Sequence, residues 1–177
     1  MSDFDEELVE EIESFDEIDD EVSDLTTDVD FAVAAWHEDG RWTLATIPDP
    51  FNLEKIITRL KSQQTNGGAI ALIAIDEEFF MIIRVLGTHI SLFLSDITAA
   101  FDYEVAEDLL EIADIAMPEE DEEPGPAGHL EILADLGMSG MEISALCDDD
   151  ELFPDEQLEA IASRLGFGTD FSELLDL

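Results

Sequence analysis

Basic residues are scarce in this chain. Its 177 residues include 6 Lys and Arg against 47 Asp and Glu, which gives a formal net charge of −41 at pH 7. Nucleic acids and anionic membranes are normally bound by clustered Lys and Arg, so the composition disfavours direct binding to either. It favours a basic protein as the partner, because so many carboxylates steer a cationic surface toward the chain. Adaptation to a salt-rich cytoplasm also produces acidic surfaces and stays open as an alternative.

Cysteines and long apolar runs are lacking as well. Cys147 is the only cysteine, which excludes an intrachain disulfide and a four-cysteine zinc site. No apolar run reaches the roughly 18 to 20 residues of a membrane span, and the N-terminus lacks the basic and apolar regions of a signal peptide. We therefore expect a soluble, cytoplasmic protein that does not bind membranes.

Residues 1–30 are rich in carboxylates and contain no Lys or Arg. Such a segment repels itself and buries little, so the composition predicts an acidic disordered tail. Within it, Phe4, Leu8, Ile12 and Phe15 recur at helical spacing. These four residues are a candidate partner-binding site, as one face of an amphipathic helix that folds against a basic, grooved partner. Chance periodicity in a solvated tail is the alternative.

Residues 31–116 have the pattern of an α+β sheet domain. Alternating apolar residues predict a hairpin over 31–46, and helical spacing predicts a helix that begins after Asn52. Three further apolar stretches predict strands, and the first, "AIALIAI", is apolar throughout, which is typical of a central strand buried on both faces. A last helix spans roughly Tyr103 to Asp114.

The resulting order, ββαβββα, predicts a five-stranded antiparallel sheet with packed helices. Longin-like and profilin-like folds share this order of elements, and the likeness implies nothing about function. A separate ββα unit packed on a three-strand meander is the main alternative.

Residues 117–128, "MPEEDEEPGPAG", have the composition of an acidic Pro/Gly linker. Residues 129–177 predict a helical C-terminal segment, with a short helix at "HLEILADLG", a capping box at Ser139 and Glu142, and a longer helix opened by Pro154. About fifty residues rarely hold a core alone. We therefore expect these helices to pack on the sheet domain or on a partner.

The stretch "AAWHEDGRWTLATI" sets His37 beside two carboxylates. A zinc site needs about four ligands, and the two other histidines lie in different predicted elements. Glu38, Asp39 and Gly40 instead predict the turn of a hairpin, since Asp-Gly adopts the backbone conformations that such turns require. No metal ion or cofactor is expected.

Cys147 falls on a predicted helix with Ile143 and Leu146, which predicts core packing and not a nucleophile. The three aspartates after it lack the glycine and the ligand spacing of a calcium loop. Glycine-rich phosphate loops and the GxSxG elbow are missing from the sequence. The sequence therefore predicts no catalytic, cofactor-binding or metal-binding residue.

Five segments together resemble one known family: "FAVAAWHEDGRW", "GGAIALIAIDEEFFMIIRVLG", "ISLFLSDITAAFDYEVAEDLLE", "HLEILADLGMSGMEISALCDD" and "LFPDEQLEAIASRLGFG". In order, from about Phe31 to Gly168, they look like the actinobacterial tRNA adenosine deaminase-associated proteins. The resemblance implies an association with that deaminase, beside which the family is encoded, and it carries over no catalytic residues. The deaminase itself requires H-x-E and a downstream P-C-x-x-C. With Asp39 in place of that Glu and a single cysteine, this chain is not the deaminase.

We therefore expect a non-catalytic accessory protein that binds a basic protein, and the resemblance makes the tRNA adenosine deaminase the candidate partner. One alternative is a regulator that mimics nucleic acid and competes for a basic groove. A second is an enzyme with an unrecognised site, which a deep pocket holding His37 or His89 near converging carboxylates would indicate.

Overall fold

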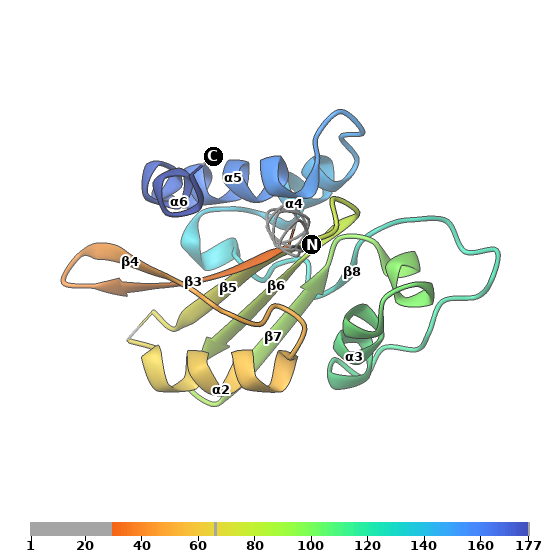
Figure 1. The fold of residues 1–177 in the computed structure, drawn as a ribbon, viewed down its shortest axis with the longest axis horizontal. Helices are drawn as coiled ribbons and strands as arrows, with labels where there is room; N and C mark the ends of the chain where they lie inside the picture. The colour runs from red at the N-terminus through yellow and green to blue at the C-terminus, as the bar shows by residue number, and fades with distance from the viewer. Residues whose placement is uncertain (1–29, 66, 177) are drawn as a thin grey trace, which may run out of the picture.

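One antiparallel sheet organises the residues that the computed structural model describes, 30–65 and 67–176 (Figure 1). Its six strands lie in the order β4-β3-β5-β6-β7-β8. Their bounds are Phe31–Glu38 for β3, Arg41–Thr46 for β4, Ala69–Ile75 for β5, Phe79–Leu86 for β6, His89–Leu94 for β7 and Ala127–Gly128 for β8.

The five predicted strands are present, but the prediction of a five-stranded sheet is wrong by one strand. The sixth, β8, lies inside the segment predicted as a linker and pairs with the end of β7. A strand of two residues is too short to show any periodicity in the sequence. In addition, Gly128 adopts a positive φ of 104°, which brings its backbone against Leu92. Because β3 pairs with β5 as well as with β4, the hairpin and the meander form one sheet, and the alternative of two separate units is wrong.

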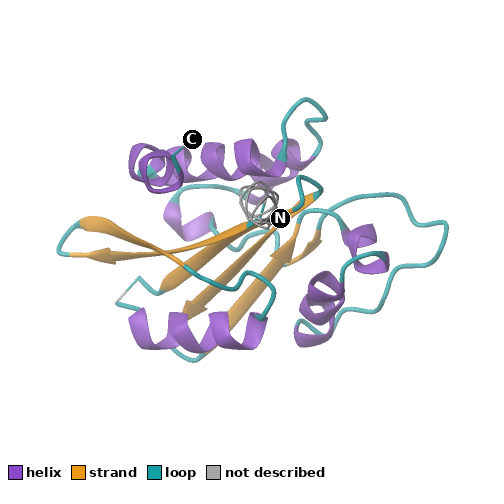
Figure 2. Ribbon diagram, viewed as in Figure 1, coloured by secondary structure: helices purple, strands orange, loops and turns teal. Residues whose placement is uncertain are grey.

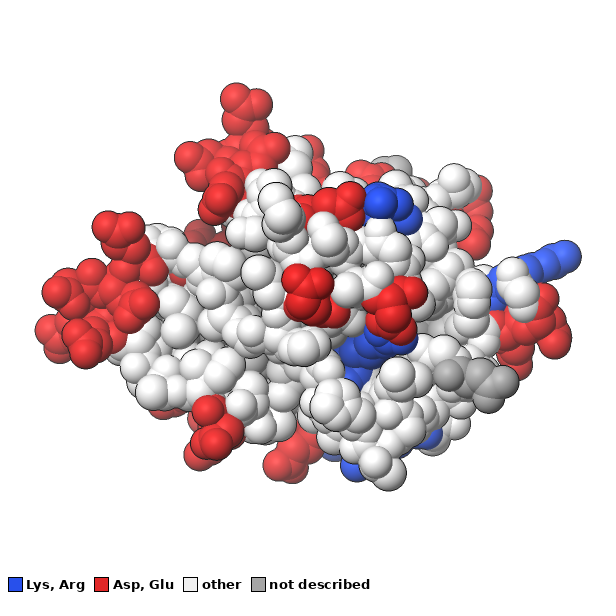
Figure 3. All heavy atoms as spheres, turned by 180° about the vertical axis from the view of Figure 1, so that it is seen from behind, with Lys and Arg blue, Asp and Glu red and all other residues white. Residues whose placement is uncertain are grey.

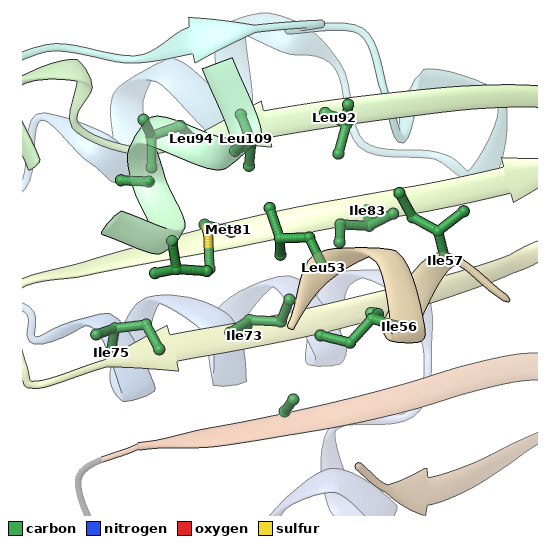
Figure 4. Close-up of a cluster of buried hydrophobic side chains, with 14 of the residues drawn as sticks. Leu53, Ile56, Ile57, Ile73, Ile75, Met81, Ile83, Leu92, Leu94 and Leu109 are labelled. Atoms are coloured by element: carbon green, nitrogen blue, oxygen red, sulfur yellow. The ribbon is translucent and has the colours of Figure 1, made fainter. Parts of the chain in front are cut away.

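Two helices cover the first face of the sheet, α2 at Leu53–Gln63 and α3 at Glu104–Ile112, with a short 3₁₀ helix, η1, at Ile97–Phe101. Asn52 caps α2 as predicted, since its side chain accepts a hydrogen bond from the Lys55 amide at 3.1 Å. The apolar stripe of α2 packs on side chains of β5 and β6 (Figure 4). The stripe consists of Leu53, Ile56, Ile57 and Leu60.

The C-terminal helices cover the second face (Figure 2). They are α4 at Gly140–Cys147, α5 at Pro154–Leu165 and α6 at Gly168–Leu175. Every residue of β5 is therefore buried, because alternate side chains enter the cores on opposite faces of the sheet, as the unbroken apolar run predicts. Of the two possibilities for the C-terminal helices, the structure shows packing on the sheet.

In the C-terminal segment, one prediction made from local sequence patterns is confirmed and another is wrong. The capping box is present, with Ser139 and Glu142 each accepting a hydrogen bond from the other's amide. Only a 3₁₀ turn, η2 at Ala134–Leu136, forms where the first short helix was predicted, because Gly137 already turns the chain in the left-handed conformation. Helix α6 was not predicted. Its eight residues begin with a glycine, and it packs on the sheet through buried Phe171.

A buried cation joins η2 to the sheet. Arg84 of β6 is 5% exposed on the second face, and its guanidinium donates to both carboxylate oxygens of Asp135. The same group donates to the carbonyl oxygens of Ile132 at 3.2 Å and Gly67 at 3.0 Å. Its Nε atom has no partner among the residues that the structure describes. Because a buried charge must be paired, this contact fixes the start of the C-terminal segment on the sheet.

Candidate interaction surface

Three acidic loops that are distant in sequence meet at one end of the sheet and, together with Pro124 and Gly125, line an acidic hollow of about 400 Å³. The loops are the β5–β6 turn, the segment after β7 and the α4–α5 connection. Six carboxylates line the hollow: Glu77, Glu78, Asp96, Asp148, Asp149 and Asp150. No Lys or Arg belongs to its lining among residues 30–65 and 67–176, so the hollow presents negative charge only.

The β5–β6 turn positions Glu77 and Glu78. Asp76 and Glu77 have φ values of 53° and 56°, and the Glu78 amide donates to the Ile75 carbonyl at 2.9 Å, which closes a tight turn. The turn is held from outside, because the Tyr103 hydroxyl donates to Asp76 Oδ2 at 2.7 Å and the Asp76 amide donates to Asp30 at 2.6 Å. The hydrogen bond to Asp76, with burial and the nearby carboxylates, raises the pKa of Tyr103, so the phenol stays a proton donor.

The other two loops are fixed by capping interactions. Asp96 caps η1 by accepting hydrogen bonds from the Thr98 amide at 2.9 Å and the Thr98 hydroxyl at 2.6 Å. In the α4–α5 loop, Asp149 accepts from the Glu151 amide at 3.0 Å. Gln157 of α5 donates to the Leu146 carbonyl at 2.7 Å and so ties that loop to the helix. The carboxylates thus stand on turns with defined backbone geometry.

Cys147 and Phe153 also line the hollow, one with a thiol and the other with an aromatic ring. Cys147 is half-buried against the second-face core, as its place on the predicted helix indicated. Burial, followed by the charges of Asp148 and Asp96, raises the pKa of the thiol to about 12. The thiol is therefore protonated near neutral pH and lacks the character of a nucleophile. Phe153 is 55% exposed at the rim and offers an apolar surface beside the carboxylates.

Charge is unevenly spread over the molecular surface (Figure 3). In that view, acidic side chains gather on the projections that correspond to the loops 116–126 and 148–153 of Figure 1, and much of the area between them is uncharged. Three of the six basic residues, Lys55, Arg59 and Lys61, belong to α2 on the first face. The acidic hollow and the basic helix therefore lie on different parts of the molecule.

His37, from the stretch "AAWHEDGRWTLATI", lies beside the hairpin turn, as the turn prediction implies. His37 is exposed at the end of β3, and its ring packs against Trp42 at 4.4 Å between centroids. Asp39 and Gly40 both have positive φ, 54° and 81°, which confirms the hairpin turn. His89 lines a different hollow, which it shares with His129 and in which the described lining includes no carboxylate.

Metal ligands do not gather in the part of the chain that the structure describes. No group of three or more His, Cys, Asp or Glu side chains there is placed to hold a metal ion. No helix in these same residues has the length and apolar character required to cross a membrane. The candidate partner-binding residues Phe4, Leu8, Ile12 and Phe15 lie outside the described residues.

Part of the acidic hollow could be anticipated from sequence. In a meander, the turn after the first strand and the end of the third strand lie at the same end of the sheet, so the order of the strands alone places Glu77 and Asp96 at one end. No sequence signal places Asp148, Asp149 and Asp150 beside them, because that contact depends on how α4 and α5 pack across the second face.

Comparison with known proteins gives two matches. The family model of Rv3753c-like tRNA adenosine deaminase-associated proteins matches residues 30–168. Protein Rv3753c of Mycobacterium tuberculosis (strain ATCC 25618 / H37Rv) is 35% identical over 151 residues, which cover 82% of this chain and 87% of that protein. No solved structure matches the chain.

Proposed function

This chain belongs to the Rv3753c-like tRNA adenosine deaminase-associated protein family, which confirms the resemblance of its five segments, and we propose that it is a non-catalytic accessory protein that binds a basic protein partner. The family name suggests an association with the tRNA adenosine deaminase, which makes that enzyme the first partner to test. Its tRNA-binding surface is expected to be cationic, because tRNA is polyanionic.

The acidic hollow is the observation that carries this proposal. Six carboxylates on three fixed loops, without a lining Lys or Arg among the described residues, provide concentrated negative charge beside the exposed ring of Phe153. A basic surface would be steered toward it over the Debye length of about 8 Å at physiological ionic strength. Once docked, the partner would cover Phe153 and gain apolar contact in the centre of the interface.

The chemistry of the reactive side chains supports a role without catalysis. The Cys147 thiol is held protonated by burial, and His37 is exposed at the end of β3, beside Trp42. Among the described residues, no carboxylate lines the hollow that contains His89. An activated nucleophile or a general base oriented by a carboxylate would require different surroundings.

The test is binding of the purified full chain to the purified deaminase by isothermal titration calorimetry at low and at near-physiological salt. A triple variant, Asp148→Asn with Asp149→Asn and Asp150→Asn, removes three charges from the hollow and retains the side-chain oxygen that caps the loop. Three exposed carboxylates on the first face, changed as Glu54→Gln, Glu107→Gln and Glu111→Gln, are the control with the same change in net charge.

We expect the hollow variant to bind about tenfold more weakly at low salt, since each exposed ion pair contributes about 0.2 to 1 kcal/mol. The control should lose less than about threefold, because only the general field of the molecule changes. An affinity that is the same at both salt concentrations would reject the electrostatic mechanism but would still support the deaminase as the partner. The absence of any complex at low salt would reject the deaminase as the partner.

A further inference from the structure

Within the residues that the structure describes, the sheet ends in an open edge at β4. This strand pairs only with β3 among the described residues, and it is the outermost strand of the sheet in Figure 1. The amide of Ile47 donates to the Ala32 carbonyl at 2.8 Å, which fixes the alternation of the antiparallel ladder. By that alternation, the amide and carbonyl groups of Trp42, Leu44 and Thr46 point away from β3. They offer a row of donors and acceptors to an added strand.

A groove of about 820 Å³ runs along this edge between β4 and α6. Its apolar part is formed by Trp42, Leu44 and Leu174, of which Leu174 is 39% exposed. Trp42 is held in place, because its indole nitrogen donates to the Leu165 carbonyl at 3.2 Å and its ring packs on Phe167 at 4.7 Å. The groove is therefore largely preformed, with a rigid aromatic side chain in its wall.

Charge along the groove is mostly negative. Glu38 and Asp39 line it from the hairpin, and Asp170 and Glu173 line it from α6. Arg41 is the one basic residue in its described lining. Four carboxylates above an apolar floor match an extended segment that carries Lys or Arg on one side and apolar side chains on the other, because successive residues of a strand point to opposite faces.

We propose that the β4 edge and its groove bind an extended basic segment of the partner protein, which adds to the sheet as a seventh strand. This inference rests on the proposed function, since it specifies the chemistry and the binding mode of the basic partner. The backbone groups of Trp42, Leu44 and Thr46 supply hydrogen bonds, the groove accepts the apolar side chains, and the four carboxylates select cationic residues.

The negative charge of the groove also favours a basic segment over two other possible occupants, a second copy of the chain and the chain's own residues 1–29. A second copy of the chain brings a net charge of −41 to an acidic groove. Residues 1–29 of the chain itself carry many carboxylates and no Lys or Arg. Both would place like charges side by side, whereas a basic segment gains from the same field.

The experiment measures fluorescence anisotropy of a labelled nine-residue peptide of alternating Lys and Val with the full chain. Two further peptides are N-methylated on every second amide, on the valines in one and on the lysines in the other, so that charge and side chains are unchanged. Strand addition uses one set of amides, so at least one methylated peptide should lose tenfold or more in affinity. Equal binding of all three peptides would mean that charge alone holds them, and would overturn the proposal.

A pair of variants tests the location. Asp170→Asn with Glu173→Gln removes two charges from the groove, and Glu107→Gln with Glu111→Gln removes two exposed charges from α3. We expect the groove variant to bind the peptide about three to ten times more weakly and the α3 variant less than about twice as weakly. Equal losses would overturn the proposal.

The other occupants and the proposed function are tested separately. An unlabelled peptide of residues 1–20 that competes more strongly than the basic peptide would assign the groove to the chain's own segment. A dimer that the basic peptide dissociates in sedimentation runs would assign it to a second copy. Either result would overturn the proposal. The peptide assay contains no deaminase, so failure of this inference and failure of the deaminase as partner are distinguishable.

Discussion

Replacing Asp135 with alanine should destabilise this protein even though it lowers an excessive negative charge. The carboxylate accepts two hydrogen bonds from the Arg84 guanidinium, which is buried and cannot move into water without disturbing β6. In Asp135→Ala, the acceptors left to the guanidinium among the described residues are the carbonyl oxygens of Ile132 and Gly67. A buried charge is then left partly unpaired.

The size of the effect follows from exposure. A hydrogen bond to a charged group contributes about 1.5 to 3 kcal/mol, and two are lost. The Asp135 side chain is 61% exposed, so water can replace part of the lost contact, which brings the expected cost to about 2 kcal/mol. For a chain of this size, that corresponds to a melting temperature lower by about 4 to 8 °C.

Urea unfolding followed by circular dichroism measures this cost. The control is Asp121→Ala, an exposed aspartate in the loop 116–126 whose removal changes the net charge equally. It should leave stability unchanged or raise it slightly, because repulsion decreases. In an Arg84→Met background, Asp135→Ala should cost less than about 0.5 kcal/mol. The reasoning would be refuted if Asp135→Ala cost the same in both backgrounds, or no more than Asp121→Ala.

Three further predictions concern single sites. The guanidinium beside Asp135 holds the pKa of that carboxyl below its ordinary value of 3.8, so its contribution is complete above that pH. The stability difference between wild type and Asp135→Ala should therefore shrink as pH falls through the folded-state pKa, and a difference that grows in acid would contradict this. Gly128→Ala would place a Cβ against the Leu92 carbonyl at a positive φ, and should cost about 2 kcal/mol by urea unfolding. Gly125→Ala, where a Cβ meets nothing within 4 Å, should be nearly neutral, and equal costs would refute the role of β8. Trp42→Phe removes the indole hydrogen bond and should lower stability by about 1 kcal/mol, a cost that an unchanged urea midpoint would disprove.

Periodicity predicted the centre of this fold well. The unbroken apolar run of β5 predicted a strand buried on both faces, and the stripe of α2 predicted the helix that covers one of them. Both signals are local, because burial on one or two faces imposes a pattern of apolar residues within a single element. The Asp39-Gly40 turn was predictable for the same reason, since few residue pairs adopt its backbone conformation.

The two-residue strand β8 and the last helix, α6, were not predicted from the sequence. Strand β8 has two residues, so its place in the sheet depends on the open edge of β7 and on the conformation of Gly128. Helix α6 forms where Phe171 reaches the core beside Phe31, at a ring distance of 5.9 Å. Neither contact leaves a periodic signal, because each joins residues that are distant in sequence.

The amino-acid sequence by itself determined the acidic character of this protein, the α+β class, the central strand and the family. These follow from composition and from patterns within single elements or segments. Only the tertiary structure decided that the C-terminal helices cover the second face, that Arg84 pairs with Asp135, and that three acidic loops surround one hollow. The physical reason is that each of these contacts depends on how finished elements pack against one another, and many packings are compatible with the same local pattern.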